Sequence, residues 1–362
     1  MKIGVLGSGQ LGRMLALSAY PLGHQMRFLA SSEEDPSSLL GNTFIQNGSQ
    51  EIIEEFAKNS DVVTYESENT AVSIVKEISQ KTMVYPSAKS LYTSQHRGRE
   101  KSLFDKLNIP CAPYQMVNNL SELKIAVENI GLPAILKTAT DGYDGKGQFL
   151  IQSDSQLDQA WKSMSGVESI LEGFINFKRE LSLVAVRGVD NTHEYYPLVE
   201  NSHHNGILRL TIAPAQNISP KLQQQAESYM RSLLDEMNHV GVLTIELFET
   251  DNNLVVNEMA PRVHNSGHWT IEGARTSQFE NHIRAITETP LGDTSCTHKY
   301  SAMINIIGEQ GPIDKALTLK NAHLHLYNKT EREGRKLGHI TITANTLDDL
   351  NTSLETLSDF MP

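Results

Sequence analysis

The sequence predicts an α/β domain with a doubly wound parallel sheet, followed by an α+β region and a small C-terminal domain. Three observations lead to this prediction. Apolar runs alternate with helical segments over residues 2–85, prolines interrupt the chain at positions 110 and 113, and the segments beyond them read as mixed α+β. The chain has 362 residues, so two or three domains are expected. We place them at residues 1–95, 96–295 and 296–362, with a smaller lobe of the second at about 110–170.

In the first domain, apolar runs of strand length are separated by segments with helical periodicity. Strands are expected at residues 2–6, 26–30, 61–65 and 82–85, and helices at 13–20, 51–58 and 74–80. Such alternation predicts a parallel sheet covered by helices.

The second and third regions read as mixed α+β. A charged helix is expected at 94–107, a strand ending at 137, a strand at 148–151 and a helix at about 157–162. Further strands are expected at 180–187, 242–249 and 254–259, and helices at 220–238 and 277–287. The strands at 242–249 and 254–259 should pair as a hairpin around residues 251–253. The tail should contain strands at 302–307, 323–327 and 339–343.

The composition is that of a globular protein with small-molecule partners. The hydrophobic fraction is 39%, and 31 Lys and Arg against 43 Asp and Glu give a net charge of −12, which argues against a broad nucleic-acid or anionic-membrane surface. The only two cysteines, Cys111 and Cys296, exclude a disulfide scaffold and a cysteine-type zinc module. The start of the chain is too broken by glycine for a signal peptide, and no apolar run approaches a membrane span. We therefore expect a cytoplasmic protein.

Gly7, Gly9 and Gly12 have the spacing of a dinucleotide-binding turn between a strand and a helix. Glu33 is only a marginal match for the acidic residue that NAD requires. Three interpretations stay open: NAD, a phosphate or ribose-phosphate substrate, or a tight turn without a ligand. Glu66 and Glu68 follow the third expected strand, where open α/β sheets place ligand sites, although exposed loop acids are the simpler interpretation.

The segment from Thr140 to Gln148 contains three glycines among charged and hydrogen-bonding residues, which suits a loop that folds over phosphates. A solvated hairpin turn is the alternative. Lys137 ends the apolar strand just upstream, and a lysine beside a glycine loop favours phosphate binding.

Glu246 and Glu258 are carboxylates among apolar strand residues, a placement that costs free energy unless each is paired or binds a metal. One lies on each arm of the expected hairpin, so the two could lie side by side and hold Mg²⁺ together with nucleotide phosphate oxygens. The alternative is a pair of salt bridges to Arg262 or Arg209.

A dense polar run, residues 260–269, follows this hairpin directly. His264 and His268 could bind zinc, but they lack a third ligand at a convincing spacing. An anion-binding loop that uses Arg262 and Asn265 fits better. A second basic segment, residues 332–339, is either a solvated turn or a phosphate-binding turn.

Four motifs, at residues 10–15, 142–147, 257–269 and 334–339, together resemble the N5-carboxyaminoimidazole ribonucleotide synthase family of purine biosynthesis. They occur in the family's order and span nearly the whole chain. The resemblance implies an ATP-grasp fold, usually as a homodimer. It also implies the reaction: ATP would phosphorylate bicarbonate to carboxyphosphate. This intermediate would deliver CO₂ or a carboxyl group to the exocyclic amine of 5-aminoimidazole ribonucleotide and leave ADP and phosphate.

The resemblance also implies roles for individual residues. The ATP-binding residues would be Arg97, Lys137, Gly142, Gly145, Gly147, Gln148, Glu172, Gly173, Phe174, Ile175, Glu180, His203, Asn257 and Glu258. Within this set, Arg97 and Lys137 would hold phosphates, Glu172, Phe174 and Ile175 would meet the adenine, and Glu180 the ribose. Glu246 and Glu258 would bind Mg²⁺. The catalytic residues would be Tyr143, Asp144, Lys146, Arg262 and Lys336. The residues for the ribonucleotide would be Gly9, Gln10, Leu11, Glu66, Glu68, His264, Asn265, Ser266 and Arg335.

Two positions depart from the family pattern. Lys146 stands where relatives often carry arginine, which keeps the charge but loses the bidentate fork. Gly98 stands where a larger apolar residue is usual. Three alternatives remain: another ATP-grasp carboxylate-amine ligase, a nicotinamide-dependent oxidoreductase, and a nucleotide-sensing protein without turnover.

Overall fold

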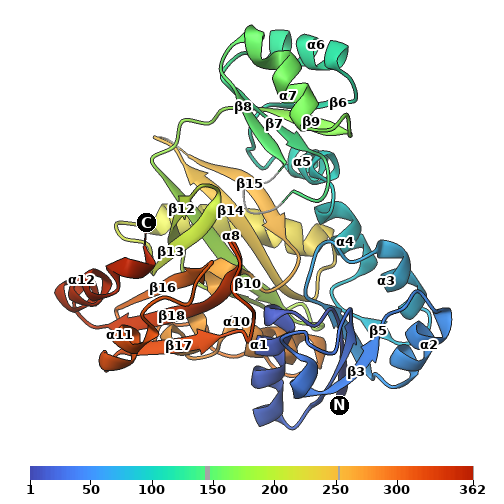
Figure 1. Ribbon diagram of the computed structural model, residues 1–362, viewed down its shortest axis with the longest axis vertical. Coiled ribbons are helices and arrows are strands. Elements are labelled where there is room, and N and C mark those ends of the chain that lie inside the picture. Colours follow the sequence, from blue (N-terminus) through green and yellow to red (C-terminus); the bar gives the residue numbers. More distant parts are fainter. Residues whose placement is uncertain (143–146, 252, 362) are drawn as a thin grey trace.

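The computed structural model describes residues 1–142, 147–251 and 253–361, which form three β-sheets (Figure 1). The first sheet is parallel, with strand order β3-β2-β1-β4-β5. Its strands are β1 (Lys2–Leu6), β2 (Gln25–Ala30), β3 (Asn42–Ile45), β4 (Val62–Tyr65) and β5 (Met83–Val84). Its helices are α1 (Gln10–Ala19), α2 (Gln50–Lys58) and α3 (Val72–Ile78). The predicted parallel sheet is confirmed.

The edge strand β3 was not predicted from the sequence, and its four residues are exposed or only partly buried. Such a strand has no run of buried apolar residues to reveal it. Helix α1 begins at Gln10, three residues before the predicted start, so part of the glycine motif belongs to its first turn.

The helix predicted at 94–107 is two helices, α4 (Ala88–Ser94) and α5 (Arg97–Lys106). The break has a local cause. His96 is extended at φ −137°, and its ring nitrogen accepts from the backbone N–H groups of Gly98 and Arg99, so a new helix starts there.

The second sheet is a small antiparallel one that forms the lobe at the top of Figure 1. Its strands lie in the order β6 (Tyr114–Val117), β9 (Ser169–Gly173), β7 (Ala134–Thr138) and β8 (Gln148–Ile151). Helices α6 (Leu120–Ile130) and α7 (Leu157–Ser163) share its apolar core.

The third sheet has nine strands, eight of them in the order β15-β14-β10-β12-β13-β16-β18-β17, with β11 beside β10. They are β10 (Arg179–Arg187), β11 (His193–Tyr195), β12 (Val199–His204), β13 (Ile207–Ala213), β14 (Gly241–Glu249), β15 (Leu254–Ala260), β16 (Tyr300–Ile307), β17 (Ala322–Leu326) and β18 (Lys336–Ala344). The predicted hairpin of β14 and β15 is confirmed. We call this third sheet the central sheet. Because β13 pairs with β16, the C-terminal strands β16, β17 and β18 continue it.

The helices of this part are α8 (Pro220–Glu236), α9 (Thr270–Gly273), α10 (Gln278–Ile286), α11 (Ile313–Thr318) and α12 (Leu347–Thr356). Helices α1 and α10 lie together in Figure 1, and one apolar core joins the first sheet to the central one: Val5 and Leu15 belong to the same cluster as Phe279 and Ile283. Within the described part of the chain, no helix combines the length and apolar character that crossing a membrane needs.

Candidate active site

A cavity of about 740 Å³ lies where the first sheet, the lobe, the β14–β15 hairpin and the C-terminal strands meet. Of the predicted site residues, it is lined by Gly9, Gln10, Leu11, Glu66, Glu68, Arg97, Lys137, Gly142, Gln148, Glu180, His203, Glu246, Asn257, Glu258, Arg262, His264, Asn265 and Lys336. These come from positions as far apart as 9 and 336, so the fold gathers all four motifs into one space.

Other predicted residues do not line this cavity. They are Gly147, Glu172, Gly173, Phe174, Ile175, Ser266 and Arg335. Glu172 is buried in the protein beside the cavity, whereas the side chain of Phe174 is 44% exposed to solvent. Tyr143, Asp144, Gly145 and Lys146 lie outside the described residues.

One end of the cavity presents Lys137 from strand β7. Its Nζ donates to Glu172 Oε2 at 2.9 Å, and the buried Lys101 approaches the same oxygen at 3.6 Å. Burial acts to raise the pKa of Glu172, but the attraction of Lys137 and Lys101 outweighs it and brings the pKa to about 2. Glu172 is therefore ionised and holds Lys137 in place.

The same end has an apolar wall that was not predicted from the sequence. Phe177 and Phe248 stack with ring centroids 4.6 Å apart and an interplanar angle of 12°, and Ile135 and Leu208 also line the cavity. Flat aromatic and aliphatic surfaces suit a planar base. Phe248 alternates with buried Leu247 along β14, a signal that could have placed it on the cavity face.

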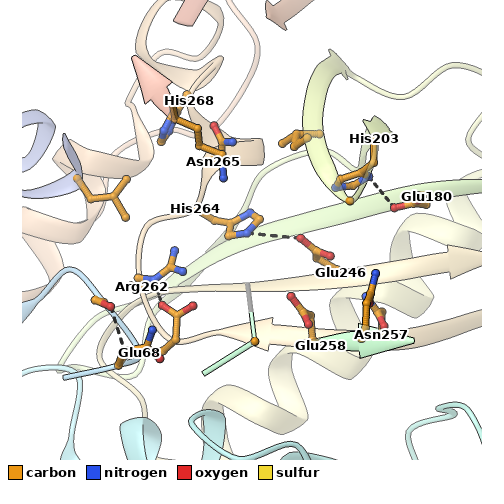
Figure 2. A pocket seen from close by; sticks show the side chains of 18 of the residues that line it. Glu68, Glu180, His203, Glu246, Asn257, Glu258, Arg262, His264, Asn265 and His268 are labelled. Carbon is orange, nitrogen blue, oxygen red and sulfur yellow. Dashed lines mark hydrogen bonds and ion pairs between the residues drawn. The ribbon is translucent and has the colours of Figure 1, made fainter. Parts of the chain in front are cut away.

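Glu180 and His203 form a second charged pair on this side, with Oε2 and Nδ1 2.7 Å apart (Figure 2). They project from the neighbouring strands β10 and β12. Burial acts to lower the pKa of His203, but Glu180 and the other nearby carboxylates outweigh it and raise the pKa.

Glu246 and Glu258 are directly paired residues of the β14–β15 hairpin, and the register shifts next to them, at Asn257. Figure 2 shows both carboxylates in the cavity. Arg97 donates to Glu258 Oε2 at 2.8 Å, and His264 Nε2 lies 3.5 Å from Glu246 Oε1. Among the described residues no salt bridge joins Arg262 or Arg209 to either carboxylate, which counts against that alternative, and Arg97 is the partner of Glu258.

These two carboxylates differ in ionisation. Burial, and then the charge of Glu258, raise the pKa of Glu246 to about 7. Burial also acts to raise the pKa of Glu258, but Arg97 outweighs it and the pKa falls. Arg97 thus compensates the charge of Glu258 but not that of Glu246. A divalent cation that prefers oxygen ligands would supply the missing positive charge. Among the described residues no group of three or more His, Cys, Asp or Glu could hold a metal, so the zinc hypothesis for His264 and His268 gains no support.

Another ion pair in the cavity joins Arg262 to Glu68 (Figure 2). The Nε of Arg262 donates to Glu68 Oε2 at 2.5 Å. Burial acts to raise the pKa of Glu68, but Arg262 outweighs it and brings the pKa to about 2. Burial, then Arg262 and Lys336, lower the pKa of His264 to about 3, so its ring is neutral. The Nδ1 of His264 accepts from the backbone N–H of Ser266, so its proton is on Nε2, which faces Glu246.

The glycine turn at the start of α1 is filled by a side chain of the protein. The N–H groups of Gly9 and Gly12 both donate to the carboxylate of Glu66. Gly7 has φ +111°, and a Cβ there would lie 2.5 Å from Glu66 Oε1. The glycine spacing therefore serves to seat Glu66, and a nucleotide is not needed to explain it.

The C-terminal strands close the cavity with basic and aromatic groups. Lys336 lines it, whereas Arg335 turns away and donates to Thr330. Lys329, which was not among the predicted site residues, donates to Gln10 at 2.5 Å, and burial with nearby cations lowers its pKa to about 8. Tyr327 also lines the cavity, and its hydroxyl is 2.6 Å from His339 Nδ1.

Other lining residues that were not predicted for the site are Ser67, Asn69, Gly206 and His268. Ser67 and Asn69 alternate with Glu66 and Glu68, which were expected near a ligand site because they follow the third predicted strand. His268 lies in the polar run, where its neighbours gave the signal.

Known proteins resemble this chain over nearly its full length. Three family models match: a ribonucleotide synthetase preATP-grasp domain at residues 1–95, an ATP-grasp domain at 102–279 and a phosphoribosylaminoimidazole carboxylase C-terminal domain at 301–353. The N5-carboxyaminoimidazole ribonucleotide synthase of Pseudomonas aeruginosa is 46% identical over 343 residues, which cover 94% of each chain.

Solved structures agree with this similarity. The crystal structure of an N5-carboxyaminoimidazole ribonucleotide synthetase from Thermus thermophilus matches with a TM-score of 0.94 and 45% identity, over 99% of this chain and 98% of that one. An N5-carboxyaminoimidazole synthase from Aspergillus clavatus, in complex with ADP and 5-aminoimidazole ribonucleotide, matches with a TM-score of 0.92 and 34% identity, over 99% and 98%.

Proposed function

Since the chain belongs to the N5-carboxyaminoimidazole ribonucleotide synthase family, it is an ATP-grasp ligase that carboxylates 5-aminoimidazole ribonucleotide in purine biosynthesis, and we propose that its 740 Å³ cavity performs the whole reaction. The observation that carries the proposal is the convergence of three groups in this cavity. They are Lys137 beside the aromatic wall, the Glu246–Glu258 pair, and Arg262 with Lys336. The first two suit a nucleoside triphosphate, and the third suits a second anionic substrate.

ATP takes the side of the cavity that faces the lobe. Its base lies against Phe177 and Phe248, its ribose near Glu180, and its phosphates near Lys137 and Arg97. The stacked rings and the two cations support this placement, because Arg97 bonds Glu258 and Phe248 lies two residues from Glu246 on strand β14. Glu172 supports the nucleotide indirectly, through its bond to Lys137.

The ribonucleotide takes the opposite side, between the first sheet and the C-terminal strands. Lys336, with Arg262, binds its phosphate, and Glu68 and Glu66 lie toward its ring and ribose. The charge distribution supports this, because the cations Lys336 and Arg262 line that side of the described cavity, and Lys329 donates to Gln10, another lining residue. The turn from Gly7 to Gly12 does not grip this phosphate through its Gly9 and Gly12 N–H groups, since Glu66 takes both.

Glu246 and Glu258 would hold Mg²⁺, with Asn257 next to them. Carboxylate oxygens, together with the phosphate oxygens of a bound nucleotide, would supply the oxygen donors that Mg²⁺ prefers. When bound, Mg²⁺ would neutralise charge on the phosphates during transfer.

In the reaction, a bicarbonate oxygen attacks the γ-phosphorus of ATP, which gives carboxyphosphate and ADP. The exocyclic amine of the ribonucleotide then attacks the carboxyl carbon, the C–O bond to phosphate breaks, and the amine loses a proton. Lys137 and Arg97 stabilise the transferring phosphoryl group, and Arg262 with Lys336 binds the anions on the other side. The walls from the lobe and from the C-terminal strands keep water away from carboxyphosphate.

The enzyme acts as a homodimer in the cytoplasm. The resemblance to the family supports the dimer, and the two free cysteines, Cys111 and Cys296, support a reducing compartment. Sedimentation velocity would test the dimer: we expect a single species with twice the mass of one chain.

Phosphate release measured with each substrate omitted in turn tests the proposed function. We expect release to require ATP, bicarbonate and 5-aminoimidazole ribonucleotide together. Release at the full rate without the ribonucleotide would mean that the cavity is that of a different ATP-grasp ligase or of an ATPase.

A further inference from the structure

Two buried histidines join the N-terminal part of the chain to the central sheet: His282 reaches strand β4 and His239 reaches helix α4. Both are held by one backbone residue, Val242 of β14. The N–H of Val242 donates to His282 Nδ1 at 3.1 Å, and its carbonyl oxygen is 3.0 Å from His239 Nε2. An N–H can only donate and a carbonyl can only accept, so His282 is unprotonated at Nδ1 and His239 carries its proton on Nε2. The backbone of the central sheet thus fixes both tautomers.

The other nitrogen of each ring reaches a hydroxyl of the N-terminal part. His282 Nε2 is 2.8 Å from Thr64 Oγ1 on β4, and His239 Nδ1 is 3.1 Å from Ser90 Oγ on α4. Thr64, Ser90 and His239 are 0% exposed and His282 is 1% exposed. Because no water competes at such depth, these hydrogen bonds define one relative position of the two parts.

The surroundings show that this contact is built into the fold. Phe279 and Ile283 of α10 pack in the apolar core shared with the first sheet, on either side of His282 in the sequence. Gly241 has φ +107°, and a Cβ there would lie 2.8 Å from His282 Cε1, so the chain makes room for the ring. Apolar packing is not directional, whereas these hydrogen bonds are.

The hydrogen bonds to Thr64 and to Ser90 differ in how close they lie to the cavity. Thr64 lies two residues before Glu66, which accepts from the N–H groups of Gly9 and Gly12. It lies four residues before Glu68, which pairs with Arg262. Ser90 belongs to α4, and none of the described residues of that helix lines the cavity. The hydrogen bond to Thr64 can therefore be tested, and the hydrogen bond to Ser90 serves as its control.

We propose that His282 is a positioning residue for the ribonucleotide side of the site, which acts through Thr64 to hold Glu66 and Glu68 against α1 and Arg262. This inference rests on the proposed function only for the identity of the substrate. The hydrogen-bonded arrangement itself does not depend on it.

The test compares Thr64→Val, which removes the hydroxyl at nearly constant volume, with Ser90→Ala as the control at the other histidine. Thr64→Val should raise the KM for 5-aminoimidazole ribonucleotide about five- to tenfold, the usual effect of one lost hydrogen bond, and leave the KM for ATP unchanged. Thr64→Ser, which keeps the hydroxyl, should restore the wild-type value. Ser90→Ala should change neither KM.

Amide hydrogen exchange gives a readout that needs no substrate. Residues 65–69 and 9–12 should exchange about fivefold faster or more in Thr64→Val than in the wild type, and not in Ser90→Ala. If Thr64→Val does not fold, Thr64→Cys takes its place, since a thiol is a weaker hydrogen-bonding group. Equal exchange and an unchanged ribonucleotide KM would overturn the inference while the proposed function stands. Failure of the proposed function would instead show in the wild type, which would then release no phosphate with the three substrates.

Discussion

Glu246 and Glu258 face each other across the β14–β15 hairpin, yet the pKa of Glu246 is raised to about 7 while that of Glu258 is lowered. Burial and the neighbouring carboxylate act on Glu246. Arg97 neutralises only Glu258. The hairpin therefore presents an acidic pair with one negative charge too many for the groups around it, and a divalent cation is the group that fits.

We expect Glu258→Gln to lower turnover by about 10²-fold or more, because the cation that neutralises the phosphates loses one of its two carboxylate ligands. Asp251→Asn is the control, since Asp251 lies at the turn of the same hairpin, does not line the described cavity and forms an exposed ion pair with Lys178. Circular dichroism should show that both variants fold. Turnover of Glu258→Gln near that of Asp251→Asn would remove the metal role.

Lys336→Ala should raise the KM for 5-aminoimidazole ribonucleotide ten- to hundredfold, which corresponds to about 1.5–3 kcal/mol for one charge-assisted contact, and should leave the KM for ATP nearly unchanged. Arg335→Ala is the matched control, because Arg335 has the same charge one position away but bonds Thr330 outside the cavity. A rise in the ATP KM alone would show that the two substrates are placed the wrong way round.

Phe248→Leu should raise the KM for ATP several-fold, because the stacked wall of Phe177 and Phe248 loses one ring. Phe174→Leu should have little effect, since Phe174 is 44% exposed and does not line the cavity. Steady-state kinetics for both variants separates the two phenylalanines. A larger effect at Phe174 would restore the adenine contact that the sequence resemblance implies.

The fold should lose stability in mild acid through its two joining histidines. Burial lowers the pKa of His239 to about 4 and that of His282 to about 3, below the ordinary value of about 6.5. The unfolded chain therefore binds protons first, so this stability is complete above about pH 6.5 and falls as the pH drops toward 4, by about 1.4 kcal/mol per pH unit for each ring. Urea unfolding at several pH values measures it.

A variant isolates this effect from other titrating groups. His239→Gln does not titrate, so its free energy of unfolding should fall by about 1 kcal/mol less than that of the wild type between pH 6.5 and 5.5. An equal fall in both proteins would show that His239 is not kept neutral by the fold.

The sequence predicted what depends on local pattern. The parallel sheet follows from alternating apolar and helical segments, and the pairing of Glu246 with Glu258 follows from two strands joined by a short turn. The polar strand β12, with its run Asn201 to His204, carries no apolar signal and was missed. Contacts between distant residues were also missed. Nothing near Gly9 shows that Glu66 takes its N–H, and nothing near His282 shows that it bonds Thr64, 218 positions away.

Transfer of oxygen from bicarbonate to phosphate tests the central claim most directly, that one cavity joins ATP, bicarbonate and 5-aminoimidazole ribonucleotide through carboxyphosphate. The enzyme is given ¹⁸O-labelled bicarbonate with the other two substrates, and the released phosphate is analysed by mass spectrometry. We predict one labelled oxygen in each phosphate, because the P–O bond formed from bicarbonate survives when the C–O bond breaks. Unlabelled phosphate formed together with carboxylated product would contradict this claim.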